Sequence, residues 1–496
     1  MDGITGQTLT YRELDQITDT MAWQLSDLGV RPGDVVAYLS QNRIGIVSLI
    51  FALGKLGAAW TPLNPQAQLR EWVRQLEHSQ ALFVISDMAH VEESVKEEQV
   101  AAGSKSLTWV NLNELSLSSP YRPPFPIRSK SGDKAALIYT SGTTDSPKGV
   151  WHTHQTLWEW NFTLLVSLGI DQDDCLINPY PLFHMGGVGF SLATIQAGAT
   201  LLLETPFEAE HFVDSVKRYG ATITLMVPTM VQSLLDLNAV KPVELQNSSL
   251  RELITTSAPL MTSTRHEMEK TWPNLSLSVL YSATEAIFSL LRREKPKAGL
   301  CVGRPVWGTE ITILDQNKKA VPPGQAGTIY VQGYGVFPGY HLSPDQFGSW
   351  HQNWFTCHDI GYQDNEGYLY LVDREKDLIN SGGEKISSLE IENVLRSHPD
   401  IREAAVIGVP DRYWGESIHA LVVRINRSLS AEEVRQFARN LLPPFKVPKS
   451  ITFIQELPKT GTGKLKKSAL RQFLRQDVIW NVSKIPTTSE SDPFSP

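Results

Sequence analysis

Apolar and polar positions along the chain alternate between a helical and a strand-like period. Thr10 and Glu13 form a capping-box pattern, and apolar residues then recur at helical spacing from Leu14 to Leu25, which predicts a helix that stops near Gly29. Short apolar runs separated by further helical patterns follow at residues 35–39, 81–85, 135–139, 199–203, 221–227 and 277–281. This alternation predicts a layered α/β fold with largely parallel sheets.

The pattern changes twice in the second half of the chain. From Glu310 onwards the runs ITILD, GTIYVQG and YLYLVD predict short strands joined by turns, as in a small β-barrel or meander. Near Asp373 a charged segment leads to a Gly-Gly pair, a capping box from Ser387 to Glu390 and a compact α+β unit. We therefore expect a large domain over residues 1–374, a small domain over 375–477 and a disordered tail over 478–496.

Composition and charge limit the possible partners. The chain has 496 residues and a net charge of −8, and it contains no strongly basic block, so nucleic acid is not an expected partner. The three cysteines are far apart and show no metal-ligand spacing, which favours a reducing compartment without disulfides. The start of the chain lacks a signal core, and the apolar run from Gly45 to Trp60 is too short to span a bilayer, so we expect a buried helix there. A cytoplasmic protein without an integral membrane segment is predicted.

One stretch, YTSGTTDSPKGV at residues 139–150, carries the strongest chemical signal. It follows a buried apolar run and combines two glycines with hydroxyl side chains and Lys148. Consecutive N–H groups, hydroxyl donors and an ammonium suit a polyphosphate ligand. An ordinary polar hairpin remains the alternative. The spacing is not that of a Walker A loop, and Val150–Trp151 predicts a strand rather than a helix.

The segment TSGTTDSPKG resembles the phosphate loop of the adenylate-forming enzymes, which include acyl- and aryl-CoA synthetases, adenylation domains and beetle luciferases. Further matching segments follow in the family's order: PLFHMGG (181–187), TSAPL (256–260), YSATE (281–285), WFTCHDIG (354–361) with DREKDLINSGGEKISSLEIE (373–392), and PKTGTGK (458–464). They span nearly the whole chain, and the chain is most similar to an acyl-CoA synthetase. The resemblance implies a large N-terminal domain and a small, mobile C-terminal domain.

The resemblance also implies a reaction. A carboxylate attacks the α-phosphorus of ATP, which gives acyl-AMP and pyrophosphate, and the thiol of coenzyme A then displaces AMP. The expected cofactors are ATP, Mg²⁺ and coenzyme A, and the expected partners are a small carboxylic acid and the acyl acceptor. The protein itself is expected to be a monomer or homodimer.

The resemblance assigns the nucleotide site to residues spread over the chain. Tyr281 matches the tyrosine that lies against adenine, Asp359 the aspartate that accepts from the ribose hydroxyls, and Arg374 an arginine that reaches the ribose. The remaining nucleotide and coenzyme A candidates are Thr140, Ser141, Gly142, Thr143, Thr144, Lys148, Ser257, Ala258, Pro259, Ser282, Lys376, Gly382 and Gly383. A charged surface linker is the alternative for Lys376, and a simple turn for the Gly382–Gly383 pair.

The candidate catalytic residues come from four segments. Glu285 matches the glutamate that helps hold Mg²⁺, with Thr144 as a second metal candidate, and Thr284 matches a threonine near the α-phosphate. His184 matches a residue that flanks the carboxylate, although a packed core histidine is the alternative. Lys464 resembles the lysine that moves in to bridge the carboxylate and the α-phosphate, whereas chemistry alone would make it solvated surface.

Three departures from the family pattern bear on activity. Asp145 replaces the last glycine of the phosphate loop, Ser282 replaces the glycine of YGxTE, and Cys357–His358 replace the two residues before Asp359. These changes could add a carboxylate beside phosphate, narrow the acyl pocket or disturb a turn, and loosen the nucleotide site. They leave every assigned charged group in place, so activity is still expected.

Three functions remain open from the sequence. The first is an ATP- and CoA-dependent acid ligase, the second an adenylate-forming ligase that passes the acyl group to an amine or a carrier-protein thiol, and the third a degenerate nucleotide-binding protein. The expected acid pocket, at residues 158–162, 185–190, 222–229 and 281–288, is apolar and aromatic. A hydrophobic acid, aliphatic or aryl, is therefore predicted, with a role in fatty acid metabolism as one possibility.

Overall fold

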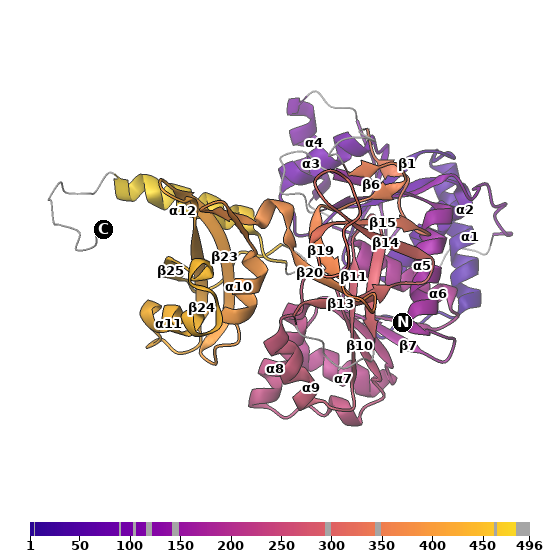
Figure 1. Ribbon diagram of the computed structural model, residues 1–496. Coiled ribbons are helices and arrows are strands. Elements are labelled where there is room, and N and C mark those ends of the chain that lie inside the picture. Colours follow the sequence, from indigo (N-terminus) through magenta and orange to yellow (C-terminus); the bar gives the residue numbers. More distant parts are fainter. Residues whose placement is uncertain are drawn as a thin grey trace, which may run out of the picture. The chain divides into compact units, whose positions relative to one another are not determined.

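The computed structural model describes residues 1–3, 5–88, 91–102, 106–115, 122–140, 148–292, 299–342, 349–460 and 464–482. The chain divides into two compact units (Figure 1). The first is Met1–Glu375, and the second holds the described residues from Lys376 onwards.

The first unit contains a seven-stranded sheet that carries the phosphate-loop segment. Four parallel pairings join β5, β2, β1, β3 and β4, whereas β6 pairs antiparallel with β5 and with β16. In order across the sheet, the strands are β16 (Gly339–Tyr340), β6 (Lys148–Thr153), β5 (Lys134–Thr140), β2 (Ala59–Pro62), β1 (Val35–Leu39), β3 (Phe83–Ser86) and β4 (Thr108–Asn111). The β5–β6 hairpin thus closes the parallel part of the sheet at one side.

A larger, thirteen-stranded sheet forms the rest of the unit. Its parallel part is β8 (Thr200–Leu203), β7 (Cys175–Asn178), β9 (Ile223–Met226), β10 (Glu252–Thr255) and β11 (Ser276–Ser282). It continues antiparallel through β12 (Ile287–Arg292), β13 (Cys301–Pro305), β20 (Leu369–Arg374), β19 (Asp359–Gln363), β15 (Gly327–Gly333), β18 (Trp354–Phe355) and β17 (Trp350–His351), and β14 (Thr309–Leu314) pairs with β15.

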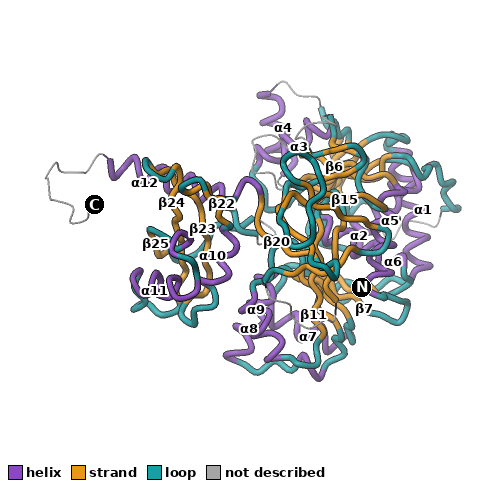
Figure 2. Tube along the Cα trace, in the orientation of Figure 1, coloured by secondary structure: helices purple, strands orange, loops and turns teal. Residues whose placement is uncertain are grey.

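Helices cover both sheets and fill the space between them (Figures 1 and 2). The largest core lies between the sheets and contains α1 (Tyr11–Asp27), α2 (Ile44–Leu56), α5 (His154–Leu168) and α6 (Met185–Gln196). The outer face of the larger sheet carries α7 (Ala209–Tyr219), α8 (Pro228–Val240) and α9 (Thr262–Thr271), and α3 (Leu69–Ser79) and α4 (Val91–Ala102) cover the outer face of the other sheet. The predicted layered α/β fold is confirmed.

The segment from Glu310 forms the expected short strands, but they do not close into a separate barrel within the described residues. β13 bonds to β12 on one side and to β20 on the other, so these strands extend the larger sheet. β14 pairs only with β15 among them. The alternation of each strand predicted the strands themselves, whereas closure depends on pairings between strands distant in sequence.

The second unit is a five-stranded sheet with helices. Its strands are β22 (Glu384–Ile386), β21 (Ile379–Ser381), β24 (Gly415–Arg424), β23 (Ile401–Asp411) and β25 (Ser450–Phe453), and its helices are α10 (Ser388–Leu395), α11 (Ala431–Leu441) and α12 (Lys467–Val482). Short 3-10 turns lie at Leu245–Asn247 in the first unit, and at Glu375–Asp377 and Pro444–Lys446. α12 includes residues 478–482 of the predicted tail, and residues 483–496 lie outside the described chain.

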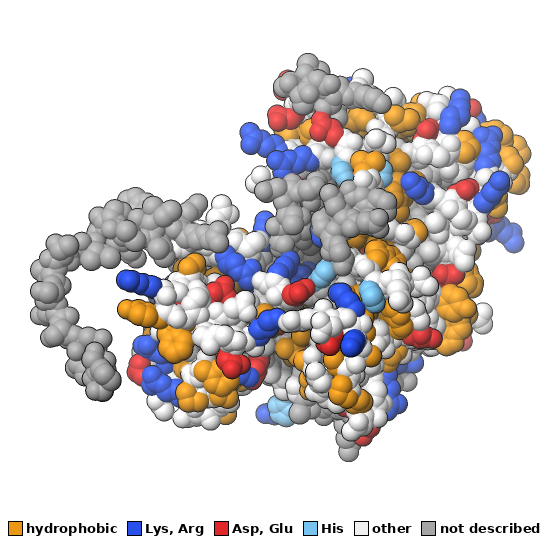
Figure 3. All heavy atoms as spheres, turned by 45° about the horizontal axis from the view of Figure 1, so that its top comes forward, with side chains coloured by type: hydrophobic (Ala, Val, Ile, Leu, Met, Phe, Trp, Pro, Cys, Tyr) orange, Lys and Arg blue, Asp and Glu red, His pale blue; other side chains and the backbone are white. Residues whose placement is uncertain are grey.

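The surface charge and the hydropathy of the helices bear on the expected absence of a basic block and of a membrane segment. On the face seen in Figure 3, acidic and basic side chains are interspersed. No helix within the described ranges is both long and apolar enough to cross a membrane.

Candidate active site

Several candidate residues of the first unit lie at one edge of the larger sheet. β7, β9, β10 and β11 run parallel, so their carboxyl ends meet at that edge. Tyr281 and Ser282 end β11, Thr284 and Glu285 follow it, and the loop of residues 256–260 follows β10. Ligands of open α/β sheets bind outside the carboxyl ends of the strands, so the fold places these candidates where a ligand site is expected.

The two ends of the phosphate-loop segment face each other across a hairpin. Thr140 ends β5 and lies opposite Lys148, the first residue of β6. Burial lowers the pKa of the Lys148 ammonium, and the nearby Glu285 carboxylate opposes this shift. The remaining loop candidates, Ser141, Gly142, Thr143, Thr144 and the departure Asp145, lie outside the described residues.

The Glu285 carboxylate is buried and held by a tyrosine. Tyr340 donates from its hydroxyl to Glu285 Oε1 over 2.9 Å, and Phe337 N donates to the Glu285 carbonyl over 2.8 Å. The neighbouring Thr284 is also buried, and its carbonyl lies 2.8 Å from His152 Nε2. A carboxylate fixed beside Lys148 offers a hard oxygen ligand next to a cationic group, which fits a metal-chelated phosphate.

The ribose candidates form a second cluster. Tyr281 donates to Asp359 Oδ2 over 2.6 Å, and Arg374 Nε lies 3.2 Å from Asp359 Oδ1. Asp359 and Arg374 are opposite each other in the β19–β20 pairing, and the Tyr281 ring stacks on Phe288 with centroids 4.5 Å apart. Burial, reinforced by the Asp359 charge, raises the pKa of Tyr281 well above its ordinary value, so its hydroxyl remains a donor.

The departure at Cys357–His358 changes a backbone position that favours glycine. His358 has φ +61, which L side chains rarely adopt. Its Nδ1 lies 3.2 Å from Glu375 Oε2, and its Nε2 lies 3.4 Å from Ser349 Oγ. These contacts hold the ring while Asp359 keeps both of its partners, so the pair does not separate the ribose cluster.

Ser257 of the expected adenine loop is tied to the expected carboxylate region. It has φ +75, and its hydroxyl lies 2.8 Å from the hydroxyl of the buried Tyr180. The Tyr180 ring is 5.1 Å from the ring of His184, and His184 Nδ1 accepts from Gly186 N at the start of α6. Because Nδ1 is an acceptor, the neutral imidazole carries its proton on Nε2.

The departure at Ser282 makes a new contact between strand ends. Its hydroxyl lies 3.2 Å from Thr256 Oγ1 on the neighbouring strand end, and the β11–β12 register shifts between Tyr281 and Ser282. The side chain therefore lies at a bulge and has a polar partner, so the tight turn tolerates it.

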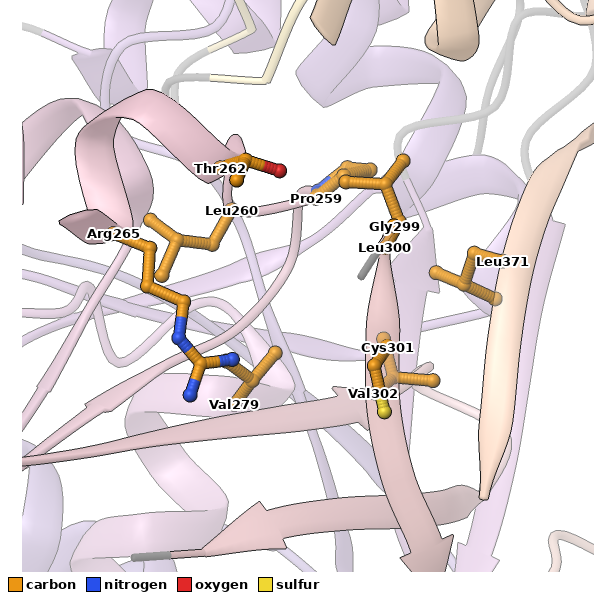
Figure 4. Close-up of a pocket in the computed structure, with 10 residues that line it drawn as sticks. All are labelled: Pro259, Leu260, Thr262, Arg265, Val279, Gly299, Leu300, Cys301, Val302 and Leu371. Carbon is orange, nitrogen blue, oxygen red and sulfur yellow. The ribbon is translucent and has the colours of Figure 1, made fainter. Parts of the chain in front are cut away.

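Pro259, in the loop of residues 256–260, borders a small cavity. Figure 4 shows Pro259 and Leu260 above Val279 of β11, with Arg265 of α9 and Cys301 of β13 on opposite sides. The volume of this cavity is about 30 Å³. That volume suits a single water molecule rather than a cofactor.

Comparison with models of known protein families identifies the family to which the chain belongs. Residues 3–341 match the model of the AMP-binding enzymes, and residues 390–464 match the model of their C-terminal domain. The chain belongs to the AMP-binding enzyme family.

Individual AMP-binding enzymes are similar over almost the whole chain. A feruloyl-CoA synthase from Amycolatopsis is 34% identical over 476 residues, which cover 94% of each protein. Among solved structures, ATP-bound MatB from Rhodopseudomonas palustris aligns with TM-score 0.88 at 26% identity over 95% of each chain. o-Succinylbenzoate CoA synthetase from Bacillus subtilis, solved with ATP and magnesium, aligns with TM-score 0.84 at 30% identity over 95% of each chain.

The other candidates of this AMP-binding enzyme lie in the second unit. Gly382 and Gly383 form the β21–β22 turn with φ +62 and +87, and Gly382 N donates to the Trp414 carbonyl over 2.9 Å. Lys464 N lies 3.2 Å from Thr460 Oγ1, and the Lys376 carbonyl lies 3.4 Å from an Arg471 guanidinium nitrogen. These contacts fix the local backbone.

Sequence reasoning missed two tyrosines at the site, Tyr340 and Tyr180. Tyr340 is far from Glu285 in sequence, and Tyr180 is far from Ser257. A Gly-Tyr or Pro-Tyr dipeptide carries no chemical signature of its own, so only the folded chain connects these hydroxyls with the site.

Proposed function

We propose that the protein is an AMP-forming carboxylic acid–CoA ligase. In the first step a carboxylate oxygen bonds to the α-phosphorus of ATP and the bond to pyrophosphate breaks. In the second, the sulfur of coenzyme A bonds to the acyl carbon and the bond to AMP breaks. One observation carries this proposal: in an AMP-binding enzyme, Lys148 and Glu285, which both lie against Tyr340, and the Tyr281–Asp359–Arg374 cluster lie on segments that fold around one sheet edge.

Magnesium fits the oxygen ligands of this site. No group of three or more His, Cys, Asp or Glu side chains suited to a metal occurs in the described ranges, so Glu285 would share a cation with the phosphate oxygens of ATP. Thr144 is the second residue that we assign to the metal. The cation would neutralise charge on the phosphates, while Lys148 supplies a further positive charge there.

We assign a hydrophobic acid, aryl or aliphatic, as the substrate. The similarity to a feruloyl-CoA synthase supports an aryl acid. His184 would flank the carboxylate, and with Nδ1 accepting from Gly186 its neutral ring carries the N–H on Nε2. The proposal also includes a cytoplasmic location, a monomer or homodimer, and a small C-terminal domain that moves over the site.

Acid-dependent exchange of labelled pyrophosphate into ATP tests the first step. A panel of aryl and aliphatic acids is assayed for exchange, and then for AMP release with and without coenzyme A. Exchange with an aryl acid and AMP release that requires coenzyme A are expected. AMP release that does not depend on coenzyme A would exclude the CoA ligase, and no exchange with any acid would exclude adenylation.

A further inference from the structure

Tyr340 connects the two charged groups that the proposed function places at the phosphates. Its buried hydroxyl donates to Glu285 Oε1 over 2.9 Å, and Lys148 Nζ lies 6.0 Å from its ring centroid. A hydroxyl donor to an ionised carboxylate makes a charge-assisted hydrogen bond, which is stronger and more directional than a neutral one. One side chain therefore touches the carboxylate and lies beside the ammonium.

The Tyr340 hydroxyl is held in the donor state and in one orientation. Its partner Glu285 is a carboxylate, which accepts in this contact, and the Ser349 side chain also hydrogen-bonds to Tyr340. The Tyr340 hydroxyl therefore donates to Glu285. Its carboxylate has one oxygen engaged by Tyr340.

The backbone of Tyr340 is fixed to the strand that leaves the phosphate loop. In the two-residue strand β16, Tyr340 is opposite Val150 of β6, and His341 N donates to the Gly149 carbonyl over 2.8 Å. β6 begins at Lys148, directly after the loop. Any displacement of β16 would therefore move the Glu285 contact and the Lys148 backbone together.

The next residue secures β16 through a chain of side-chain bonds. Trp151 Nε1 donates to His341 Nδ1 over 2.9 Å, which leaves the His341 proton on Nε2, 2.8 Å from the His78 carbonyl. His78 Nδ1 in turn lies 2.9 Å from the hydroxyl of Tyr139 on β5. Both strands that flank the phosphate loop are thereby tied to the segment that carries Tyr340.

We propose that Tyr340 is a positioning residue for adenylation, which orients the Glu285 carboxylate toward the phosphate-bound divalent cation. It acts through Glu285 and contacts no reacting atom. The gain is preorganisation: the carboxylate does not have to be ordered when the metal–nucleotide arrives. This inference rests on the proposed function, because that function makes Glu285 a metal ligand.

Metal-dependent nucleotide binding by the full-length Tyr340→Phe variant tests the inference. The affinity for α,β-methylene-ATP is measured with and without Mn²⁺, and the ratio of the two affinities reports the metal contribution without turnover. We expect the ratio to fall about tenfold, since the variant loses a hydrogen bond to a charged group. The Mg²⁺ concentration for half-maximal pyrophosphate exchange should rise by a similar factor, while thioester formation from supplied acyl-AMP stays unchanged.

Tyr330→Phe is the matched control, because Tyr330 is also buried but its hydroxyl contacts Lys318. A second test adds Tyr340→Phe to Glu285→Gln, where no further fall in the ratio is expected. Ser349→Ala should give a smaller fall by the same route and replaces Tyr340→Phe if that variant does not fold.

An unchanged ratio in Tyr340→Phe, or a fall of equal size in Tyr330→Phe, would overturn the inference. Failure of the proposed function is a different result. In that case the wild-type protein shows no pyrophosphate exchange with any acid. The ratio of nucleotide affinities with and without Mn²⁺ still reports whether Tyr340 contributes to metal-dependent binding.

Discussion

Each oxygen of the Asp359 carboxylate has its own partner: Tyr281 donates to one and Arg374 lies against the other. Asp359→Asn removes the charge and offers an amide nitrogen to one of two donors. We expect KM for ATP in pyrophosphate exchange to rise at least about tenfold, because charge-assisted bonds to the ribose and within the cluster weaken. KM for the acid should change little.

Asp364→Asn provides the control for this substitution. Asp364 also accepts from a tyrosine hydroxyl, that of Tyr370, over 3.0 Å. Its KM for ATP should match the wild-type value. An Asp359→Asn protein with an unaltered KM for ATP would refute the assignment of Asp359 to the ribose.

His152 gives a prediction about pH. Burial lowers the pKa of this histidine to about 4, from an ordinary value of 6.5, and its Nε2 lies 2.8 Å from the Thr284 carbonyl. Because the folded pKa is the lower one, the unfolded chain binds the proton more readily. The stability that His152 contributes is complete above pH 6.5 and is lost as pH falls toward 4, by up to about 3 kcal/mol.

Urea unfolding at pH 7 and pH 5 measures this effect. His152→Gln should unfold with a smaller difference between the two pH values than the wild type does, since glutamine does not titrate. Equal differences would show that His152 does not contribute to acid sensitivity.

At the residue scale, sequence could identify only the side chains that sit in short local patterns. Tyr281, Glu285 and Asp359 belong to such patterns, and the structure brings them to one region. Tyr340 and Tyr180 could not be found, because their importance lies in single hydrogen bonds to distant segments. The sequence identifies His358 as a departure from the family pattern, whereas its positive φ and its contacts can be seen only in the folded chain.

At the element scale, the β21–β22 hairpin makes a prediction about two adjacent glycines. A Cβ at Gly382 would lie 2.8 Å from Trp414 Cε3, whereas a Cβ at Gly383 would meet nothing within 4 Å. Both have positive φ, so both Ala variants carry backbone strain, and only Gly382→Ala adds a clash. We expect Gly382→Ala to cost about 1–2 kcal/mol and Gly383→Ala about 1 kcal/mol.

Thermal unfolding of the full chain gives the order of the two costs. The half-reactions then report function: if this turn serves thioester formation, Gly382→Ala should slow transfer from acyl-AMP to coenzyme A more than pyrophosphate exchange. Equal slowing of both half-reactions would remove the turn from the second step.

Elements with a local signal were predicted well. The Thr10–Glu13 capping box is present at α1, and Ser387 accepts from Glu390 N at α10. The apolar run after Gly45 contains a buried helix, α2, but its last residues form strand β2, since Gly57 ends the helix with φ +84. Whether the strands after Glu310 close into a barrel could not be predicted from their local patterns, because closure depends on which edges distant in sequence pair with each other.

At the scale of the whole molecule, Lys464 is expected to separate the two half-reactions. Lys464→Ala should reduce the rate of acid-dependent pyrophosphate exchange about a hundredfold or more, because it removes the cation that stabilises the negative charge developing during adenylation. Thioester formation from supplied acyl-AMP should persist. Lys459→Ala is the control, since Lys459 is in the same segment but pairs with Glu403 over 3.0 Å. Equal loss of both half-reactions would contradict this role.

The order of motifs along the chain was enough to predict the family and the layered fold. The sheets follow from short apolar runs, and the core between them follows from helices with apolar faces, such as α1 and α2. The role of the C-terminal unit in each half-reaction is tested by the kinetics of the Lys464 and Gly382 variants, because the backbone contacts of these residues lie within that unit.

The late strand β16 has a consequence for synthesis on the ribosome. Until Gly339 and Tyr340 emerge, β6 keeps one open edge, because its partner on that side comes from far downstream; the Trp151–His341 bond alone spans 190 positions. An open edge in a nascent chain invites wrong pairing with other chains. A truncated product that stops before residue 339 should therefore aggregate, even though it already carries the phosphate-loop segment and Glu285.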